Sequence, residues 1–279
     1  MGIIVKSNKI KNTGFGLTGM ILCLLISSCV KIQTRPDVVA ASPQYDAGAI
    51  IRADQTSRKI SLVFTGDSYG DGGEVIRRIL AEQNVVASFF LTGNFYRNPE
   101  FRSTIEGLKK DGHYLGAHSD RHLLYCSWEK RDSLLVSREQ FLEDLQNNYY
   151  EMAKFGIAKE YAPYFLPPYE WYNQQISEWT SEFGAHLINY TPGTRSHADY
   201  TTPDMGRRYV TTDSILVSIK RYEQNEKNGL NGFILLMHIG THPDRVDKLY
   251  NRLDELIIFL KSRDLHIVRI DELLNPPIY

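Results

Sequence analysis

The sequence predicts an α/β fold in which helices cover a parallel β-sheet. Short apolar segments rich in β-branched and aromatic residues alternate with segments whose apolar residues recur at helical spacing. This alternation is typical of βαβ units, whose sheet is either closed into a barrel or left open. Of the 279 residues, 42% are hydrophobic and 23% are charged, which fits a soluble domain with one sizeable core.

The N-terminal segment, residues 1–28, has the pattern of a bacterial lipoprotein signal peptide. Three lysines precede an apolar run over residues 15–26, and Ile26-Ser27-Ser28-Cys29 matches a lipobox. A plain secretory signal or a membrane anchor are the alternatives, but the apolar run is short for a hydrocarbon core of about 30 Å. We therefore expect cleavage before Cys29, lipidation of Cys29, and a lipid-anchored protein of the cell envelope, on the periplasmic side or the cell surface.

Two further parts follow the signal peptide. Residues 29–57 are polar, contain Pro36 and Pro43 and show no periodicity, which predicts a linker. Residues 58–279 form the expected folded domain. With Cys23 removed and Cys29 lipidated, Cys126 is the remaining thiol, so we expect no intramolecular disulfide.

The elements follow from apolar periodicity and from capping residues. Asn98-Pro99 and the capping box at residues 137–140 are typical helix starts. A polar stretch over residues 191–212 predicts a long loop, which is either functional or disordered. We expect strands at residues 59–64, 85–91, 114–115, 164–165, 186–190, 232–237 and 267–270, and helices at residues 72–80, 98–112, 137–152, around 176–179, 214–228 and 246–260.

Polar side chains gather directly after several of these strands. His118 and His122 have a His-x-x-x-His spacing, and two imidazoles suit zinc, cobalt, nickel or iron. An isolated pair of this kind is more often a pair of ordinary loop histidines. Asp67, Asp71 and His238, however, also follow strands, and the carboxyl ends of parallel strands meet at one edge of the sheet. This coincidence favours a shared site.

Three segments resemble motifs of the NodB-type polysaccharide deacetylases, carbohydrate esterase family four: residues 116–122 (GAHSDRH), 165–169 (FLPPY) and 234–238 (ILLMH). The resemblance runs from about residue 59 to 274. It implies a distorted, incomplete (β/α) barrel. It also implies removal of N- or O-linked acetyl groups from sugars with the help of one divalent metal ion held by one Asp and two His.

The resemblance also implies individual roles. Asp67, His118 and His122 are then the metal ligands, with zinc as the first expectation and cobalt, nickel or iron as alternatives. His238 is the general acid, and the backbone N–H of Tyr169 is the oxyanion donor. We expect Tyr169, Trp171 and Leu236 to bind substrate, although a core or surface role for Trp171 stays open.

The sequence also departs from the family pattern. Gly66 stands where the family has its catalytic base, and Leu166 stands where it has the Arg that orients this base. Asp71 is the nearest carboxylate and serves either as a replacement base or as a helix N-cap. Ile239 replaces the usual Asp after His238, and His242 is an extra imidazole that we assign to a solvated loop.

These observations predict a metal-dependent hydrolase that removes acetyl groups from an envelope or dietary polysaccharide. The missing base leaves a second hypothesis open, a lipid-anchored glycan-binding protein without turnover, and a third, a metal hydrolase that cleaves a different bond. The expected partners are an acetylated polysaccharide and, through Cys29, a membrane. The formal net charge of −1 and the lack of a basic run argue against nucleic acid.

Overall fold

The computed structural model describes residues 42–274 and Gly2. The predicted signal peptide, the lipidation site Cys29 and the first part of the predicted linker lie outside these residues. Within the described part of the chain, no helix is both long and apolar enough to cross a membrane.

A curled parallel sheet forms the centre of the domain and confirms the expected incomplete (β/α) barrel. The two edges of the sheet approach each other where the N–H of Thr191, four residues after one edge strand, donates to the carbonyl of Ile234 in the other edge strand, at 3.0 Å. In residues 42–274 this sheet has the order β7-β6-β5-β4-β3-β8, with β9 beside the start of β3. The strands are β3 (Lys59–Gly66), β4 (Ser88–Leu91), β5 (Tyr114–Ala117), β6 (Tyr164–Phe165), β7 (His186–Leu187), β8 (Phe233–His238) and β9 (His266–Ile267).

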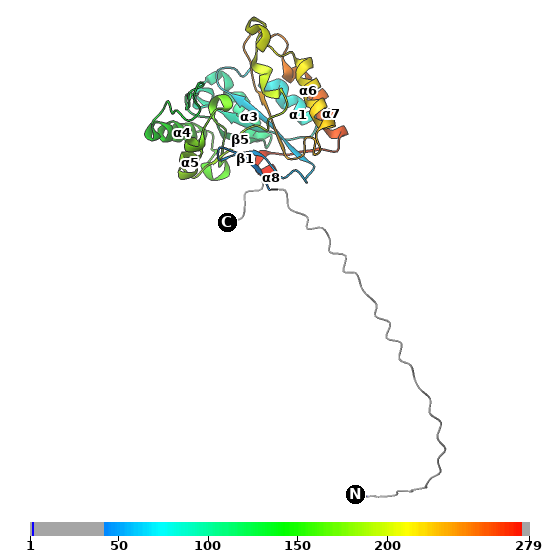
Figure 1. Ribbon diagram of the computed structural model, residues 1–279, viewed down its shortest axis with the longest axis horizontal. Coiled ribbons are helices and arrows are strands. Elements are labelled where there is room, and N and C mark those ends of the chain that lie inside the picture. Colours follow the sequence, from blue (N-terminus) through cyan, green and yellow to red (C-terminus); the bar gives the residue numbers. More distant parts are fainter. Residues whose placement is uncertain (1, 3–41, 275–279) are drawn as a thin grey trace, which may run out of the picture. The chain divides into compact units, whose positions relative to one another are not determined.

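Helices surround the sheet on its outer side (Figure 1). The predicted capping box is present, because the Ser137 side chain accepts from the Gln140 N–H and the Gln140 side chain accepts from the Ser137 N–H. The helices are α1 (Gly73–Glu82), α2 (Gly93–Arg97), α3 (Arg102–Lys110), α4 (Arg138–Ala153), α5 (Gln174–Glu182), α6 (Thr212–Asn225), α7 (Leu253–Ser262) and α8 (Ile270–Leu274).

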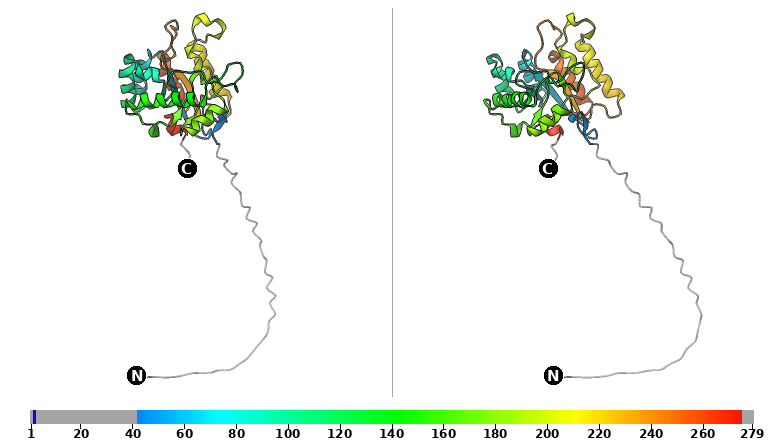
Figure 2. Two further views of the ribbon diagram at one scale, coloured as in Figure 1. Left: turned by 90° about the vertical axis from the view of Figure 1, so that its left-hand side faces the viewer. Right: turned by 60° about the vertical axis from the view of Figure 1, so that its left-hand side comes forward.

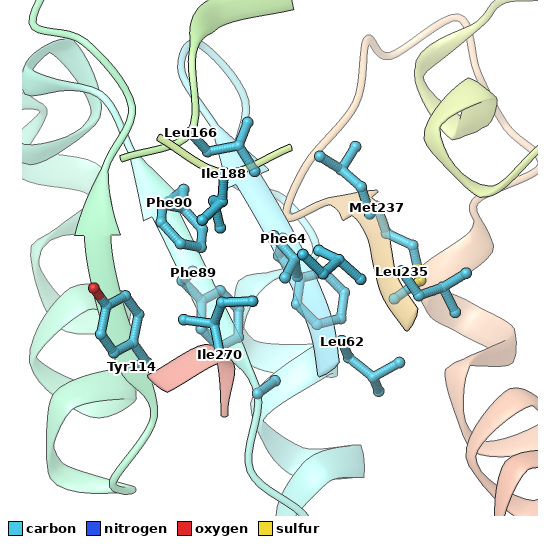
Figure 3. Packing of buried hydrophobic residues seen from close by; sticks show 14 of the residues in the cluster. Leu62, Phe64, Phe89, Phe90, Tyr114, Leu166, Ile188, Leu235, Met237 and Ile270 are labelled. Carbon is cyan, nitrogen blue, oxygen red and sulfur yellow. The ribbon is translucent and has the colours of Figure 1, made fainter. Parts of the chain in front are cut away.

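Aromatic and aliphatic side chains from neighbouring strands fill the core (Figure 3). Phe64 of β3 stacks on Phe89 of β4 with ring centroids 5.0 Å apart. Leu62 of β3 and Leu235 of β8 are fully buried beside them. Because each such side chain contributes roughly 1.5–3 kcal/mol when it is buried, this packing holds the strands, and so the loops at their ends, in place.

The predicted linker differs from the structure. Residues 44–52 form a hairpin of β1 (Gln44–Asp46) and β2 (Ala49–Arg52) that packs against the barrel. Ile50 bridges to Ile188, and the Arg52 guanidinium donates to the carbonyls of Gly229 and Asn231 at 2.7 and 3.0 Å. The compact domain therefore begins before residue 58. The sequence did not reveal this hairpin because strands of three and four residues are too short to show a periodic pattern.

The long polar loop, residues 191–212, is held in place by a buried arginine side chain. It contains two 3-10 helices, Ser196–Tyr200 and Pro203–Arg208. Arg245 is fully buried and donates to the carbonyls of Thr201 and Val210 at 2.6 and 3.1 Å. The tip of the loop lies at the end of the domain opposite to α8 (Figures 1 and 2), beside the carboxyl ends of the strands.

Candidate active site

A cavity of about 640 Å³ opens at the carboxyl ends of the strands. Polar side chains from separate elements line it, among them Asp67 after β3, His118 and His122 after β5, Glu170 after β6 and His238 at the end of β8. The structure thus brings together the three expected metal ligands and the expected general acid. Ligands and substrates bind at this end of parallel sheets.

Asp67 presents an ionised carboxylate to the cavity. Its Oδ1 accepts from Thr92 Oγ1 at 2.9 Å and Asn94 Nδ2 at 3.2 Å, and its Oδ2 accepts from Ser68 Oγ at 2.7 Å. Burial alone would raise the pKa of Asp67, but these hydrogen bonds and the nearby His122 hold it below its usual value. The negative form that a metal ligand requires is therefore favoured.

His118 is held as a neutral ligand. Its Nδ1 lies 2.7 Å from the carbonyl oxygen of Leu166. A carbonyl can only accept, so Nδ1 carries the proton and Nε2 keeps its lone pair. Burial, followed by the charge of His122, lowers the pKa of His118 to about 3. The imidazole therefore stays unprotonated at neutral pH.

The loop that carries His122 has an uncommon backbone. Ser119 and His122 have φ angles of 76° and 56°, in the left-handed region that non-glycine residues rarely adopt. The two imidazole rings are 5.2 Å apart between centroids. Burial lowers the pKa of His122. Strain of this kind persists only where neighbouring groups hold the backbone in place.

Two buried polar residues of α4 supply that support. Asp144 accepts from the N–H groups of Asp120 and Arg121 at 3.2 and 3.1 Å, and from the Tyr125 hydroxyl at 2.7 Å. Asn148, one helical turn later, accepts from the His118 N–H at 2.8 Å. We did not single out either residue from the sequence. Their signal is two polar residues four positions apart inside an otherwise apolar helix stripe.

The chemistry of Asp67, His118 and His122 fits a divalent metal, since it combines one carboxylate with two unprotonated imidazoles. Their positions are not those of an assembled site, however. Among the residues that the structure describes, no group of three or more His, Cys, Asp or Glu side chains is arranged so that it could hold a metal ion. The three side chains line one cavity.

His238 faces the same cavity and has a carboxylate partner. Its Nδ1 lies 2.6 Å from Oδ1 of Asp199, and its backbone N–H donates to Oδ2 at 2.9 Å. Burial alone would lower the pKa of His238, but Asp199 outweighs this effect and raises it. Asp199 lies in the long polar loop, where no periodicity marks it, so sequence reasoning did not find it. Asp199 supplies a carboxylate next to His238, which the buried and apolar Ile239 at the following position cannot supply.

Asp71 lies outside the lining of the cavity. Its carboxylate accepts from the Thr241 N–H at 2.9 Å and from the Tyr250 hydroxyl at 2.5 Å, and it pairs with Lys248 at 3.0 Å. The N-cap residue of α1 is Gly72, without a side-chain capping bond. These contacts fit neither the base nor the cap that we expected. Asp71, which directly precedes the N-cap of α1, instead binds the segment between β8 and α7.

The expected substrate-binding residues occupy different places. Tyr169 lines the cavity, and its ring lies 4.4 Å from that of His122. Leu236 is fully buried inside β8. Trp171 lies behind the exposed Trp128, with stacked rings 5.5 Å apart, and its Nε1 donates to the Ser127 carbonyl at 3.2 Å. Trp128 lines the cavity, although we did not single it out from the sequence.

His242 lies at the rim of the cavity. Its side chain is 47% exposed, and its Nδ1 accepts from the Asp244 N–H at 3.2 Å. Its ring meets Tyr69 edge-on, with centroids 5.6 Å apart. These contacts agree with a loop residue that is partly solvated.

Comparisons with known proteins agree with this fold. Residues 53–188 match the polysaccharide deacetylase family. A chitin deacetylase from Arthroderma benhamiae is 25% identical over 232 residues, which are 82% of this chain and 55% of the relative. The chain therefore spans about half the length of this curated relative.

Two solved structures share the fold at low sequence identity. A CE4 family pseudoenzyme from Bacillus anthracis has a TM-score of 0.63 at 19% identity, covering 82% of this chain and 70% of that one. A family 4 acetyl xylan esterase from Clostridium thermocellum, in complex with a cobalt ion, has a TM-score of 0.59 at 18% identity, covering 77% and 90%.

Proposed function

Because this chain belongs to the polysaccharide deacetylase family, we propose that it is a metal-dependent hydrolase that removes N- or O-linked acetyl groups from an envelope or dietary polysaccharide. The observation that carries the proposal is the His238–Asp199 pair, which faces the cavity lined by Asp67, His118 and His122. The proposed proton donor and the three proposed metal ligands thus line the same cavity.

Asp67, His118 and His122 would hold the metal ion, with zinc as the first choice and cobalt, nickel or iron as alternatives. Small side-chain shifts, which are common on binding, would draw the three groups together. The bound ion would supply Lewis-acid polarisation of the acetyl carbonyl and of water. The carboxylate and the two neutral imidazoles are already in the protonation states that such an ion requires.

His238 would protonate the leaving group. Asp199 fixes its Nδ1, so Nε2 is the nitrogen that can give a proton to the amine or alkoxide. The raised pKa keeps a larger fraction of the imidazole protonated near neutral pH. The backbone N–H of Tyr169 remains our candidate oxyanion donor, since Tyr169 lines the cavity beside His122.

Exposed aromatic rings at the cavity would bind the sugar. Trp128 is 57% exposed and Tyr169 is 44% exposed. Trp171 stacks behind Trp128, and the Arg131 guanidinium lies 5.3 Å from the Trp171 ring. A rigid aromatic face offers a large contact area at a low entropic cost, which suits the apolar face of a pyranose ring.

The second candidate function is a lipid-anchored glycan-binding protein without turnover. It is favoured by Gly66 and Leu166 at the positions of the usual base and its Arg, and by the contacts that hold Asp71 away from the cavity. Acetate release from acetylated oligosaccharides by the metal-loaded protein separates the two functions. Saturable sugar binding with no acetate would support the binding protein and contradict the hydrolase.

We also propose that the protein is anchored in the cell envelope through lipidated Cys29. The lipobox and the preceding apolar run support this proposal. Membrane fractionation of cells that express wild type or Cys29→Ala tests it. Wild type should sediment with membranes and carry a lipid on its N-terminal cysteine by mass spectrometry. Equal partitioning of the two proteins would contradict the anchor.

A further inference from the structure

Four acidic residues line the cavity: Asp67, Glu170, Asp204 and Asp244. Three donors bind the carboxylate of Asp67, so it is a weak proton acceptor. Asp204 accepts from the Thr202 hydroxyl, and the side chain of Asp244 is 71% exposed at the rim, 3.5 Å from His242. Glu170 is the member of this set whose carboxylate has no hydrogen-bond or ion-pair partner among the described residues.

An unusual turn places Glu170 in the cavity. Tyr169 and Glu170 have φ angles of 59° and 53°, so two successive non-glycine residues adopt the left-handed conformation. The Glu170 N–H donates to the Pro167 carbonyl at 3.1 Å, and the Glu170 carbonyl accepts from Asn189 Nδ2 at 2.9 Å. These hydrogen bonds thus hold the turn in a backbone conformation that is unfavourable for a glutamate residue. Such strained conformations are common at functional sites.

The surroundings of Glu170 suit a group that exchanges protons. It is half-buried beside His238 of β8, Asp199 of the long loop and Tyr190 after β7. Burial raises the pKa of Glu170 to about 7, with Asp199 acting in the same direction and His238 against it. A general base is most effective when its pKa lies near the working pH.

We propose that Glu170 is the general base of the hydrolysis, in place of the carboxylate that the sequence lacks at Gly66. This inference rests on the proposed function. The Glu170 carboxylate takes a proton from water as the water oxygen forms a bond to the acetyl carbon, and the carbonyl π electrons move to the carbonyl oxygen. The oxyanion electron pair then re-forms the carbonyl bond as the C–N or C–O bond breaks, with its electron pair on the leaving atom, which receives the Nε2 proton of His238. Acetic acid and a free amine or hydroxyl result, and solvent returns the proton of Glu170 to His238.

The test compares three variants with the metal-loaded wild type. Glu170→Gln keeps the shape of the side chain, and Glu170→Gly suits the left-handed backbone. Glu160→Gln is the matched control, because Glu160 is an exposed carboxylate in the 3-10 helix Lys159–Tyr161. We measure kcat and KM for acetate release, the Tm, and rescue by added formate.

We expect kcat to fall by about 10²–10⁴-fold in both Glu170 variants with little change in KM, as is usual for the loss of a general base. Glu170→Gly should keep a Tm at or above that of wild type and regain activity with formate, whereas a purely structural role would lower the Tm without rescue. Glu160→Gln should behave as wild type.

Two results overturn the proposal in distinguishable ways. If wild type and Glu160→Gln are active and Glu170→Gln keeps their kcat, Glu170 is not the base, while the proposed function stands. If the metal-loaded wild type releases no acetate from any acetylated oligosaccharide, the proposed function fails, and the role of Glu170 fails with it.

Discussion

Nδ1 of His238 lies 2.6 Å from Oδ1 of Asp199, although the two residues are 39 positions apart in the chain. Asp199 also accepts from the His238 N–H, so one carboxylate fixes both the backbone and the ring. The pair depends on the 191–212 loop, which Arg245 holds against the barrel. The proposed general acid, His238, therefore depends on a contact with a residue that is distant in the sequence.

Asp199→Asn should lower kcat by about 10²-fold or more with little change in KM. The amide cannot stabilise the imidazolium or fix the Nδ1 proton as the carboxylate does. Acetate-release kinetics measure the effect. Asp213→Asn, with a side chain that is 80% exposed on α6, is the control and should stay active. Unchanged kcat in Asp199→Asn would show that this pair does not assist the reaction.

The pH dependence of kcat/KM should be bell-shaped. Glu170 must be deprotonated to accept a proton, so activity should rise as pH increases through about 7. His238 must be protonated to donate one, so activity should fall as pH passes its raised pKa. Glu170→Gln should lose the rising limb but keep the falling limb. A rising limb that persists in this variant would belong to another group.

Asp144→Ala should weaken metal binding by about 10–100-fold, as is typical when the support of a ligand loop is removed. The variant leaves the N–H groups of Asp120 and Arg121 without their partner. Calorimetric titration with zinc measures the affinity. The neighbouring Glu143→Gln is the control, since Glu143 is exposed on the same helix. Equal affinities would mean that the loop holds its shape without Asp144.

Trp128→Ala should raise KM for acetylated oligosaccharides by about 2- to 12-fold, with little change in kcat, because a stacking contact with an aromatic ring contributes about 0.5–1.5 kcal/mol. Quenching of tryptophan fluorescence by the sugar reports binding directly. Tyr161→Ala is the control, since Tyr161 is 84% exposed and does not line the cavity. If both variants bind as wild type does, the sugar does not use the Trp128 face.

Folding stability should fall as pH decreases from about 6.5 towards 4, partly because of His113. Burial lowers the pKa of His113 from 6.5 to about 4, so in this window the unfolded state binds more protons than the folded state. Its neutral Nδ1 accepts from the Ala87 N–H at 3.2 Å. Urea unfolding at several pH values measures the slope, which His113→Gln should reduce. An unchanged slope would assign the effect to other histidines.

Periodicity and capping residues predicted most of the barrel. The strands around β3 and β8 and the capped helix α4 appear where the sequence places them, because continuous apolar runs and a capping box are local signals. The hairpin at residues 44–52 did not have such a signal. Its strands are three and four residues long and depend on contacts with residues 188 and 231.

The sequence predicted only those residues of the site that belong to a recognisable sequence motif. The sequence singled out Asp67, His118, His122 and His238, which line one cavity. Asp199 and Glu170 could not be found in this way. Asp199 reaches His238 through the fold of an aperiodic loop, and the position of Glu170 depends on two left-handed backbone angles.

Acetate release from acetylated oligosaccharides by the purified protein tests the central claim most directly, measured after metal loading and again after chelation. The metal-loaded protein should release acetate with multiple turnovers, lose this activity with the chelator and regain it with zinc or cobalt. Undiminished acetate release by the chelated, metal-free protein, or no release by the metal-loaded protein that still binds the sugar, would contradict the proposed metal-dependent deacetylase.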